Sequence, residues 1–288
     1  MQSESARGMS LLKELNNSER PFLNVEWCPP RMDMSLQQSL DAWIESNQFI
    51  RKVTSLNRLV FMTDGSTGRR EEQNLRHIIV NLGSAADHSK IVPILTAKHS
   101  LEYCLEFAEK AYELGFRSIV VLGGDRFDDL PRCVEHAYEL RKMIRERIPD
   151  LTLGGWANPH GGLRQVEYIL HKDYCADFYL SQVISHYDQK SLDEFIDACT
   201  LRGVKLPSVF GVFYYRSSNM KTLNSLARFF PVPIKELTAD FSVGRRPEDI
   251  CADSINALLR RGIRNVYLSN LPTVGVGRLL ERIEARLE

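Results

Sequence analysis

The sequence has no run of about 18 consecutive apolar residues, the length that a membrane-spanning helix needs. Its N-terminus is polar and lacks the apolar core of a secretory signal peptide. Charge is balanced, with 37 basic and 37 acidic residues and no block of like charge. Neither a nucleic acid nor an anionic membrane is therefore the expected partner. We expect a cytoplasmic protein.

The usual signatures of disulfide and metal chemistry are also missing. The cysteines are scattered, with no C-x-x-C pair and no Cys/His spacing typical of zinc. They predict free thiols in a reducing compartment. The acids and the histidine that remain as candidate metal ligands each follow a different predicted strand, so no spacing supports a site and no metal is expected. The cysteines are Cys28, Cys104, Cys133, Cys175, Cys199 and Cys251.

Two sequence motifs that often mark a function are absent as well. There is no G-x-S-x-G turn, and no cysteine has a histidine at a fixed position beside it, so no nucleophile with a partner base is visible. A G-x-G-x-x-G turn, typical of open dinucleotide-binding sheets, does not follow the first predicted strand. The pair Gly123 and Gly124, after a later strand, is too short for that signature.

Residues 22–31 hold the most informative pattern of the sequence. A short apolar run predicts a strand, and Pro29 and Pro30 end it, because proline can continue neither a strand ladder nor a helix. Glu26 therefore lies where a strand meets a loop. A lone acid at such a place is most often solvated or caps a backbone group, so its position alone does not make it catalytic.

Eight strand-like runs alternate with helical patterns along the chain. This alternation favours parallel β-α-β units, and a chain of 288 residues suits a single (βα)8 barrel. We assign the barrel to residues 1–288, with 1–19 as an N-terminal extension; an open doubly wound sheet is the alternative. The predicted strands are 22–26, 58–62, 91–96, 117–122, 151–156, 177–182, 208–215 and 265–270.

Helical periodicity fills the intervals between these strands. Ser100 is a good N-cap for one helix, and Gly115 stops it. Residues 231–246 show no regular pattern, and 239–246 within them suit either a lid or an interface. The predicted helices are 35–53, 69–82, 100–114, 131–147, a helix ending near 173, 191–201, 220–230, 247–261 and 274–287.

The active site of such a barrel lies at the carboxyl ends of its strands. The residues there are mostly polar, with acids and aromatic side chains among them, as a small-molecule cleft requires. The alternative is that these residues are polar only because loop residues usually are. His160 fits an acid–base role and a role as an ordinary loop residue equally. His186 is expected on a solvated surface. The strand-end residues are Glu26, Asp64, Thr96, Asp125, Trp156, Asn158, His160, Gln182, Tyr214, Tyr215 and Asn270.

These stretches, in this order, resemble the methylenetetrahydrofolate reductase family over residues 20–285. Val-Glu-Trp-Cys-Pro-Pro at 25–30 is similar to the family's first-strand F-E-F-F-P-P, and residues 114–125 are similar to its L-G-I-R-N-I-L-A-L-R-G-D. Weaker similarity lies at 65–70, 93–96, 156–160 and 176–182. The resemblance implies a (βα)8 barrel that carries FAD and passes hydride from NAD(P)H to a folate-bound one-carbon unit.

The resemblance also implies roles for individual residues. Glu26 would be the general acid that protonates a folate nitrogen, and Asp125 the second catalytic acid, beside flavin and pterin. A carboxyl group acting so at neutral pH needs a raised pKa, for which Val25 and Trp27 are the expected apolar neighbours. The implied cofactor-binding residues are Thr63, Asp64, Thr96, Gly124, Trp156, Asn158 and His160, and the implied substrate-binding residues are Gln182, Tyr214 and Met220.

At several positions the sequence departs from the family pattern. Ile94 replaces a histidine, and Gly123 and Leu271 each replace an arginine. Arg164 and His171 replace an acid and a lysine in the helix after the fifth strand. In the family these positions mostly contact FAD phosphates, ribose or substrate. The resemblance thus implies a retained hydride-transfer centre with an altered grip on the cofactor.

Three functions remain open at this stage. The first is an FAD-dependent reductase of a folate-bound one-carbon unit, and the second is a flavin-independent folate or one-carbon enzyme that takes hydride directly from NAD(P)H. The third is a non-catalytic folate-binding or partner-binding subunit. Retention of Glu26 and Asp125 speaks against the third, because a binding module needs neither acid. The sequence selects neither NADH nor NADPH, nor an oligomeric state, and both a homo-oligomer and a complex subunit fit it.

Overall fold

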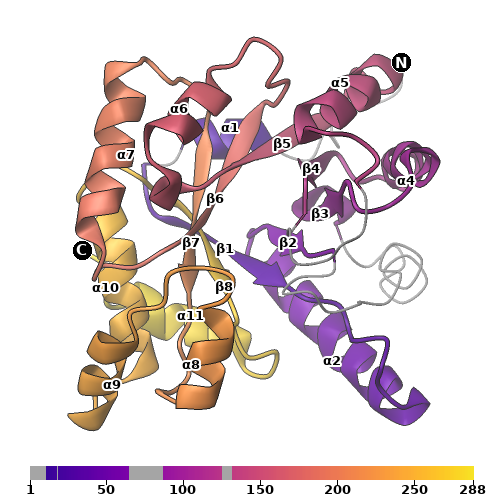
Figure 1. Ribbon diagram of the computed structural model, residues 1–288. Coiled ribbons are helices and arrows are strands. Elements are labelled where there is room, and N and C mark those ends of the chain that lie inside the picture. The colour runs from indigo at the N-terminus through magenta and orange to yellow at the C-terminus, as the bar shows by residue number, and fades with distance from the viewer. Residues whose placement is uncertain (1–10, 18, 65–86, 125–131) are drawn as a thin grey trace.

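The computed structural model describes residues 11–17, 19–64, 87–124 and 132–288. In it, eight parallel strands close into a barrel in chain order, and the last strand pairs with the first. Helices form a ring around the strands (Figure 1). The (βα)8 barrel predicted from the sequence is confirmed, and the open sheet is excluded by the pairing of the first strand with the last.

The strands agree closely with the prediction, with ends that differ by at most two residues. The largest differences are a later start of β2, a later end of β6 and an earlier end of β7. The strands are β1 Phe22–Trp27, β2 Val60–Met62, β3 Ile91–Thr96, β4 Ser118–Leu122, β5 Thr152–Ala157, β6 Phe178–Ile184, β7 Ser208–Phe213 and β8 Asn265–Ser269.

The helices agree less closely with the prediction. Residues 231–246, predicted to be irregular, contain a helix; the helix predicted to begin at 131 begins at 137; and the one predicted at 69–82 lies outside the described residues. The helices are α1 Leu11–Asn16, α2 Leu36–Ser55, α4 Leu101–Glu113, α5 Ala137–Arg147, α6 Leu163–Ile169, α7 Gln189–Leu201, α8 Met220–Leu226, α9 Ile234–Ser242, α10 Pro247–Leu259 and α11 Val276–Glu284, with short 3₁₀ helices η3 His88–Lys90 and η4 Pro159–Gly161.

Side chains alternate between two faces along each strand, and the two faces build two separate cores. The outer core lies between strands and helices, where for example Trp27 of β1 packs on Trp43 of α2 with ring centroids 5.7 Å apart. The inner core fills the barrel and includes Phe61, Phe178 and Tyr267. The described interior of the barrel is therefore a packed core below its mouth, as is usual for this fold.

The N-terminal extension contributes to the inner core. Leu11 and Leu15 of α1 are each 5% exposed and pack against the apolar side chains inside the barrel. The amide of Asn265, the first residue of β8, donates to the carbonyl of Leu15 at 2.9 Å. Helix α1 thus lies across the end of the barrel where the strands begin, opposite the mouth.

Two expectations about the chain as a whole can be compared with the structure. All six cysteines are free thiols, as predicted. Within the described ranges, no helix combines the length and the apolar character that crossing a bilayer demands.

Gly211 of β7 shapes the interior just below the mouth. A Cβ atom at this position would lie 2.5 Å from the ring carbon Cζ of Tyr267 and 2.5 Å from its hydroxyl oxygen. That hydroxyl donates to the carbonyl of Ser181 at 2.7 Å, and the Ser181 hydroxyl accepts from the backbone N–H of Gly211 at 3.1 Å. Absence of a side chain at 211 therefore lets the tyrosine ring lie flat across the barrel.

The substitution Gly211→Ala should lower the free energy of unfolding by about 1–3 kcal/mol, because a methyl group forced into a packed core displaces its neighbours. In a background that carries Tyr267→Leu, where the ring is gone, the same substitution should cost much less. Denaturant unfolding of the four proteins of this cycle measures the difference. Equal costs in the two backgrounds would show that the tyrosine ring is not what excludes a side chain at 211.

Candidate active site

A cavity of about 930 Å³ opens at the carboxyl ends of the strands, near the upper end of the ~300–1,000 Å³ typical of ligand sites. Every strand, or the residue that follows it, contributes to its lining. Helix α6 adds Gln165 and Tyr168, and the segment after β7 adds Leu226, Phe229 and Phe230. The place agrees with the prediction that the site lies at the strand ends.

Most of the predicted site residues that the structure describes line this cavity. They come from separate strands and meet only through closure of the barrel. Their roles as catalytic or binding groups stay predictions, since lining a cavity does not identify a ligand. Asp125, the second predicted catalytic acid, lies outside the described residues. The predicted residues in the lining are Glu26, Thr63, Asp64, Thr96, Gly124, Trp156, Gln182 and Asn270.

His160 and Asn158, predicted to bind a cofactor, do not line the cavity. The imidazole of His160 lies with Nδ1 3.1 Å from a carboxylate oxygen of Asp188 and with Nε2 3.1 Å from the carbonyl oxygen of Val183. The side-chain oxygen of Asn158 accepts from the backbone N–H of His160 at 3.1 Å. His160 therefore joins η4 to β6 and to the residue before α7, and Asn158 caps η4. Their predicted cofactor-binding roles stay predictions.

Tyr214 and Met220, predicted to bind substrate, also lie outside the lining. Tyr214 is buried in the outer core between strands and helices, because the alternation along β7 turns its neighbour Phe213 toward the cavity instead. Met220, the first residue of α8, is 49% exposed. From the same helix, Thr222 and Leu226 reach the cavity.

Glu26 faces the cavity from the end of β1. One of its carboxyl oxygens accepts a hydrogen bond from the hydroxyl of Ser269 of β8 at 2.5 Å. Burial raises the pKa of Glu26, and the hydrogen bond from Ser269 opposes part of that rise. Such a carboxyl group holds its proton to higher pH than a solvated glutamate and can donate it into the cavity.

The raised pKa of Glu26 does not come from the two apolar neighbours that the sequence suggested. Val25 and Trp27, the sequence neighbours of Glu26, point to the opposite face of β1 and belong to the outer core. The groups around the carboxyl come instead from β8: Ser269, and Tyr267 one layer below it. Burial, and the charge of Glu26 after it, raise the pKa of Tyr267 well above its usual range.

Asp64, at the end of β2, is held as a fixed acceptor. One carboxylate oxygen accepts from the backbone N–H of Thr96 at 2.9 Å and from the Thr96 hydroxyl at 2.8 Å. Nε2 of His99 lies 2.9 and 3.0 Å from the two oxygens. The hydrogen bond to Asp64 raises the pKa of His99. This histidine was not singled out from the sequence, which gave no sign that it would meet Asp64.

The wall formed by β4, β5 and α5 carries cations that the sequence did not point to. Arg132 donates through Nη2 to the carbonyl of Gly124 at 2.6 Å. Arg141, 1% exposed, donates to the carbonyls of Val121 and Tyr174. Both guanidinium groups, and Lys98 beside them, contribute to the lining of the cavity.

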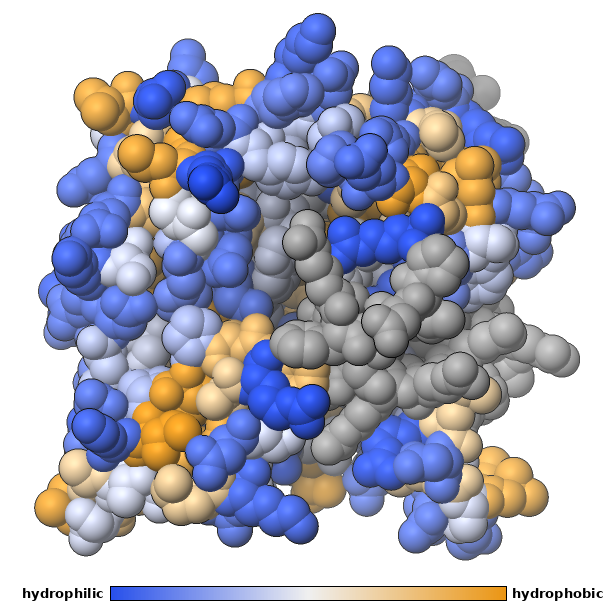
Figure 2. Space-filling view, viewed as in Figure 1, coloured by the Kyte–Doolittle hydropathy of each residue, from blue (hydrophilic) through white to orange (hydrophobic). Residues whose placement is uncertain are grey.

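The opposite wall is apolar and aromatic. Phe213 at the end of β7 packs on Phe230 with ring centroids 5.3 Å apart, and Leu226 and Phe229 continue the wall. In the space-filling view, apolar residues gather over the region of α8 (Figure 2). The cavity thus has a cationic side and an aromatic side, with Glu26 between them.

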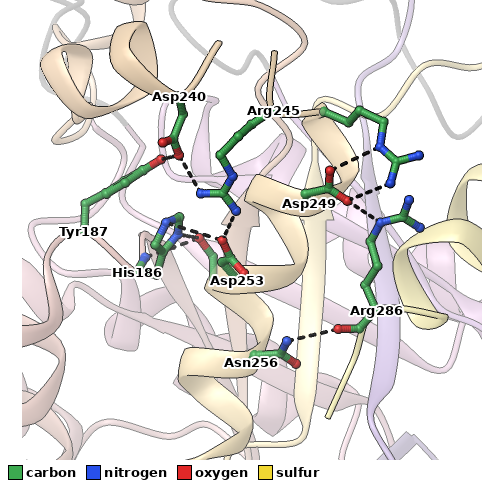
Figure 3. A network of polar contacts seen from close by, with 10 residues as sticks. His186, Tyr187, Asp240, Arg245, Asp249, Asp253, Asn256 and Arg286 are labelled. Atoms are coloured by element: carbon green, nitrogen blue, oxygen red, sulfur yellow. Dashed lines mark hydrogen bonds and ion pairs between the residues drawn. The ribbon is translucent and has the colours of Figure 1, made fainter. Parts of the chain in front are cut away.

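A network of polar contacts joins α9, α10 and the turn between β6 and α7 (Figure 3). Asp240 of α9 accepts from the hydroxyl of Tyr187 and from Arg245, whose Nη1 lies 2.7 Å away. Arg245 also pairs with Asp253 of α10. Nδ1 of His186 lies 2.9 Å from the hydroxyl of Ser254 and completes the contact between the β6–α7 turn and α10.

The sequence predicted that His186 lies on a solvated surface, and this prediction is wrong. Its side chain is 15% exposed, and burial lowers its pKa. The residues that surround it come from three separate parts of the chain, which is why the local sequence gave no indication of its position.

Comparison with known proteins gives one family and one shared fold. The sequence model described as methylenetetrahydrofolate reductase matches residues 11–271. No curated protein matches the sequence. A protein from Clostridium thermocellum, described as uncharacterised and as binding two copies of 5-methyl-5,6,7,8-tetrahydrofolic acid, superposes with a TM-score of 0.67 at 15% identity, covering 95% of this chain and 97% of its own.

More distant structures share the barrel alone. A 2,3-dimethylmalate lyase superposes with a TM-score of 0.52 at 11% identity over 96% of this chain and 84% of its own. An aldo-keto reductase from Bacillus halodurans gives 0.51 at 13% identity over 85% and 83%. At these identities the likenesses show the fold and not the reaction.

The raised pKa of Glu26 predicts how stability depends on pH. Folded protein binds the proton of Glu26 more tightly than unfolded protein does, so stability is lost as pH rises from the ordinary value of 4.5 through the raised pKa. Glu26→Gln, which does not titrate, should remove this loss and should make the protein more stable than the wild type at alkaline pH. Melting temperatures across this pH range measure the effect.

The matched control is Glu135→Gln, an acid of the same cavity lining whose side chain is 85% exposed. It should leave the pH dependence unchanged. A Glu26→Gln protein with the same pH profile as the wild type would mean that the carboxyl of Glu26 titrates as a solvated group.

Proposed function

The chain belongs to the methylenetetrahydrofolate reductase family, and from that premise we propose that it reduces a folate-bound one-carbon unit in the cavity at the barrel mouth. In this proposal, Glu26 is the proton donor. The observation that carries it is the buried carboxyl of Glu26, which faces the cavity with a raised pKa and a hydrogen bond from Ser269.

The family and the structural neighbour support folate as the ligand class. The neighbour from Clostridium thermocellum, with the same fold, binds a methylated tetrahydrofolate. A pterin is a flat ring with hydrogen-bonding edges, and the aromatic wall of Phe213 and Phe230 suits its face. Gln182, whose side-chain oxygen accepts from the backbone N–H of Val183 at 2.9 Å, is a fixed amide suited to its edge.

The acid role follows from what the reaction needs. Protonation of the folate nitrogen opens the ring that holds the one-carbon unit to an iminium, which can then accept hydride. Glu26 would supply this proton, because burial keeps its carboxyl neutral at a pH where a solvated glutamate is ionised. Ser269 would hold the carboxyl in one orientation toward the cavity. For Asp125 we keep the predicted second catalytic role.

The lining is compatible with FAD as the cofactor, although the family's own contacts are changed. Gly123 stands where the family has an arginine, yet the guanidinium of Arg132 lies over it, with its carbon 3.1 Å from the place of a Cβ atom. Asp64, Thr96, Gly124 and Trp156 would hold the flavin beside it. When bound, FAD would supply the relay of hydride from NAD(P)H to the one-carbon unit.

A second candidate is a folate enzyme that uses no flavin. The observation that favours it is the pair of folates bound by the Clostridium thermocellum protein, since a second folate could occupy the space proposed here for the flavin. In that case hydride would pass directly from NAD(P)H. The test is the visible spectrum of the purified protein, followed by turnover. This candidate would replace the first if the protein is colourless, does not bind added FAD and still oxidises NAD(P)H when methylenetetrahydrofolate is supplied.

The proposed reaction is tested by replacing the proton donor. Glu26→Gln should lower the rate of methylenetetrahydrofolate reduction by about 10²–10⁴, the usual contribution of a positioned acid. The dissociation constant of 5-methyltetrahydrofolate should change little, because the amide keeps the shape and one hydrogen bond of the carboxyl. Anaerobic turnover assays and ligand titrations measure the two quantities.

Glu135→Gln serves again as the control and should turn over like the wild type. Unchanged turnover in Glu26→Gln would exclude the acid role, and an absence of any reduction by the wild type with either NADH or NADPH would exclude the proposed reaction.

A further inference from the structure

We propose that Arg132 and Arg141 form an anion-binding subsite on the cationic wall of the cavity, and that this subsite holds the phosphate or carboxylate group at the far end of the bound ligand. The inference deepens the proposed function and rests on it for the identity of the ligand. The subsite itself rests on the position and pairing of these two arginines.

Arg132 reaches the cavity because Gly123 has no side chain in its way. Its guanidinium nitrogen atoms and carbon lie 2.9–3.5 Å from the place that a Cβ atom at Gly123 would take, and Nη2 donates to the carbonyl of Gly124. Among the described residues this is the one hydrogen bond that its side chain donates, and no described carboxylate pairs with it. Arg132 therefore has further N–H donors available at the cavity surface.

Arg141 adds a buried charge behind the same wall. Its guanidinium donates to the carbonyl of Tyr174 at 2.7 and 2.9 Å and to that of Val121 at 2.9 Å, and lies 4.6 Å from the ring centroid of Tyr174. Among the described residues none of its partners is an acid. A buried guanidinium whose partners are carbonyls alone is costly, and an anion in the adjoining cavity would offset that cost.

Other charged groups of the lining are paired or face solvent, in contrast to these two. Arg31 pairs with Asp33, and Asp64 is engaged by His99. Glu135 points largely into solvent, with a side chain that is 85% exposed. Within the described part of the lining, the surplus positive charge therefore lies at the wall of Arg132 and Arg141.

The opposite walls together specify the shape of the ligand. A flat ring system suits the aromatic side at Phe213 and Phe230, and an anionic group suits the cationic side. The planar fork of a guanidinium matches the two oxygens of a phosphate or carboxylate. Three ligands of the proposed reaction carry such a group: FAD and NAD(P)H have phosphates, and folates have a glutamate tail.

The test replaces Arg132 by glutamine, which removes the charge and keeps an amide donor of similar reach. Dissociation constants are measured for two pairs of ligands by quenching of tryptophan fluorescence, since Trp156 lines the cavity. FAD is compared with riboflavin, which has the same ring without phosphate. 5-Methyltetrahydrofolate is compared with 6-methyltetrahydropterin, which has the pterin without the glutamate tail.

Arg216→Gln is the matched control. Arg216 is exposed at the same end of the barrel and, like Arg132, donates to a main-chain carbonyl, that of Asn270 at 2.9 Å. It does not line the cavity. It reports the effect of losing one positive charge near the mouth without touching the subsite.

Arg132→Gln should weaken binding of the anionic member of at least one pair by about tenfold or more. Binding of the neutral member should not change. The loss of affinity for the anionic member should be smaller at high salt, because salt screens the charge of the arginine. A loss confined to FAD assigns the subsite to phosphate, and a loss confined to the folate assigns it to the glutamate carboxylates. Arg216→Gln should bind all four ligands like the wild type.

Three results would overturn the subsite: no change in any dissociation constant, equal weakening of the anionic and neutral members, or the same loss in Arg216→Gln. If the wild type binds none of the four ligands, the proposed function fails separately. Titration with inorganic pyrophosphate then tests the subsite by itself. Binding that is lost in Arg132→Gln would support the subsite. Binding that is unchanged in Arg132→Gln, or no binding to the wild type, would contradict it.

Discussion

Closure of eight parallel strands turns every second side chain of each strand into the barrel, and the candidate active site depends on this constraint. The last inward position of β1 holds Glu26 and the last inward position of β8 holds Ser269, so pairing of the two strands brings a carboxyl and a hydroxyl together at 2.5 Å. The layer below, which includes Tyr267, keeps water from reaching the carboxyl from beneath.

A site of this kind places polar groups where apolar packing would stabilise the fold more. Contacts elsewhere in the fold offset this loss of stability. Helix α1 closes the far end of the barrel with Leu11 and Leu15. The contacts among Asp240, Arg245 and Asp253 hold α9 against α10. The result is a cavity with three chemically distinct parts, an acid with a raised pKa, an aromatic wall and a cationic wall, each held by different elements.

The strands and the strand-end position of the site could be predicted because both follow from local patterns. Contacts between distant segments could not: His160 meets Asp188, and Arg132 lies over Gly123, through the fold alone. Phe213 and Tyr214 show a subtler limit, since a one-residue choice between adjacent aromatic residues reverses which one faces the cavity. Helix α9 was missed because the two prolines before it, Pro231 and Pro233, are typical of a loop. In the structure Pro233 is the residue that directly precedes the helix.

The central claim is that this cavity binds a folate with its reacting nitrogen at Glu26. A crystal structure of the protein with 5-methyltetrahydrofolate tests it most directly. We expect the pterin in the cavity at the barrel mouth, with the nitrogen that ring opening releases from the one-carbon unit within hydrogen-bonding reach of the Glu26 carboxyl, about 2.6–3.2 Å. A folate bound outside this cavity, or bound within it with that nitrogen turned away from Glu26, would contradict the claim.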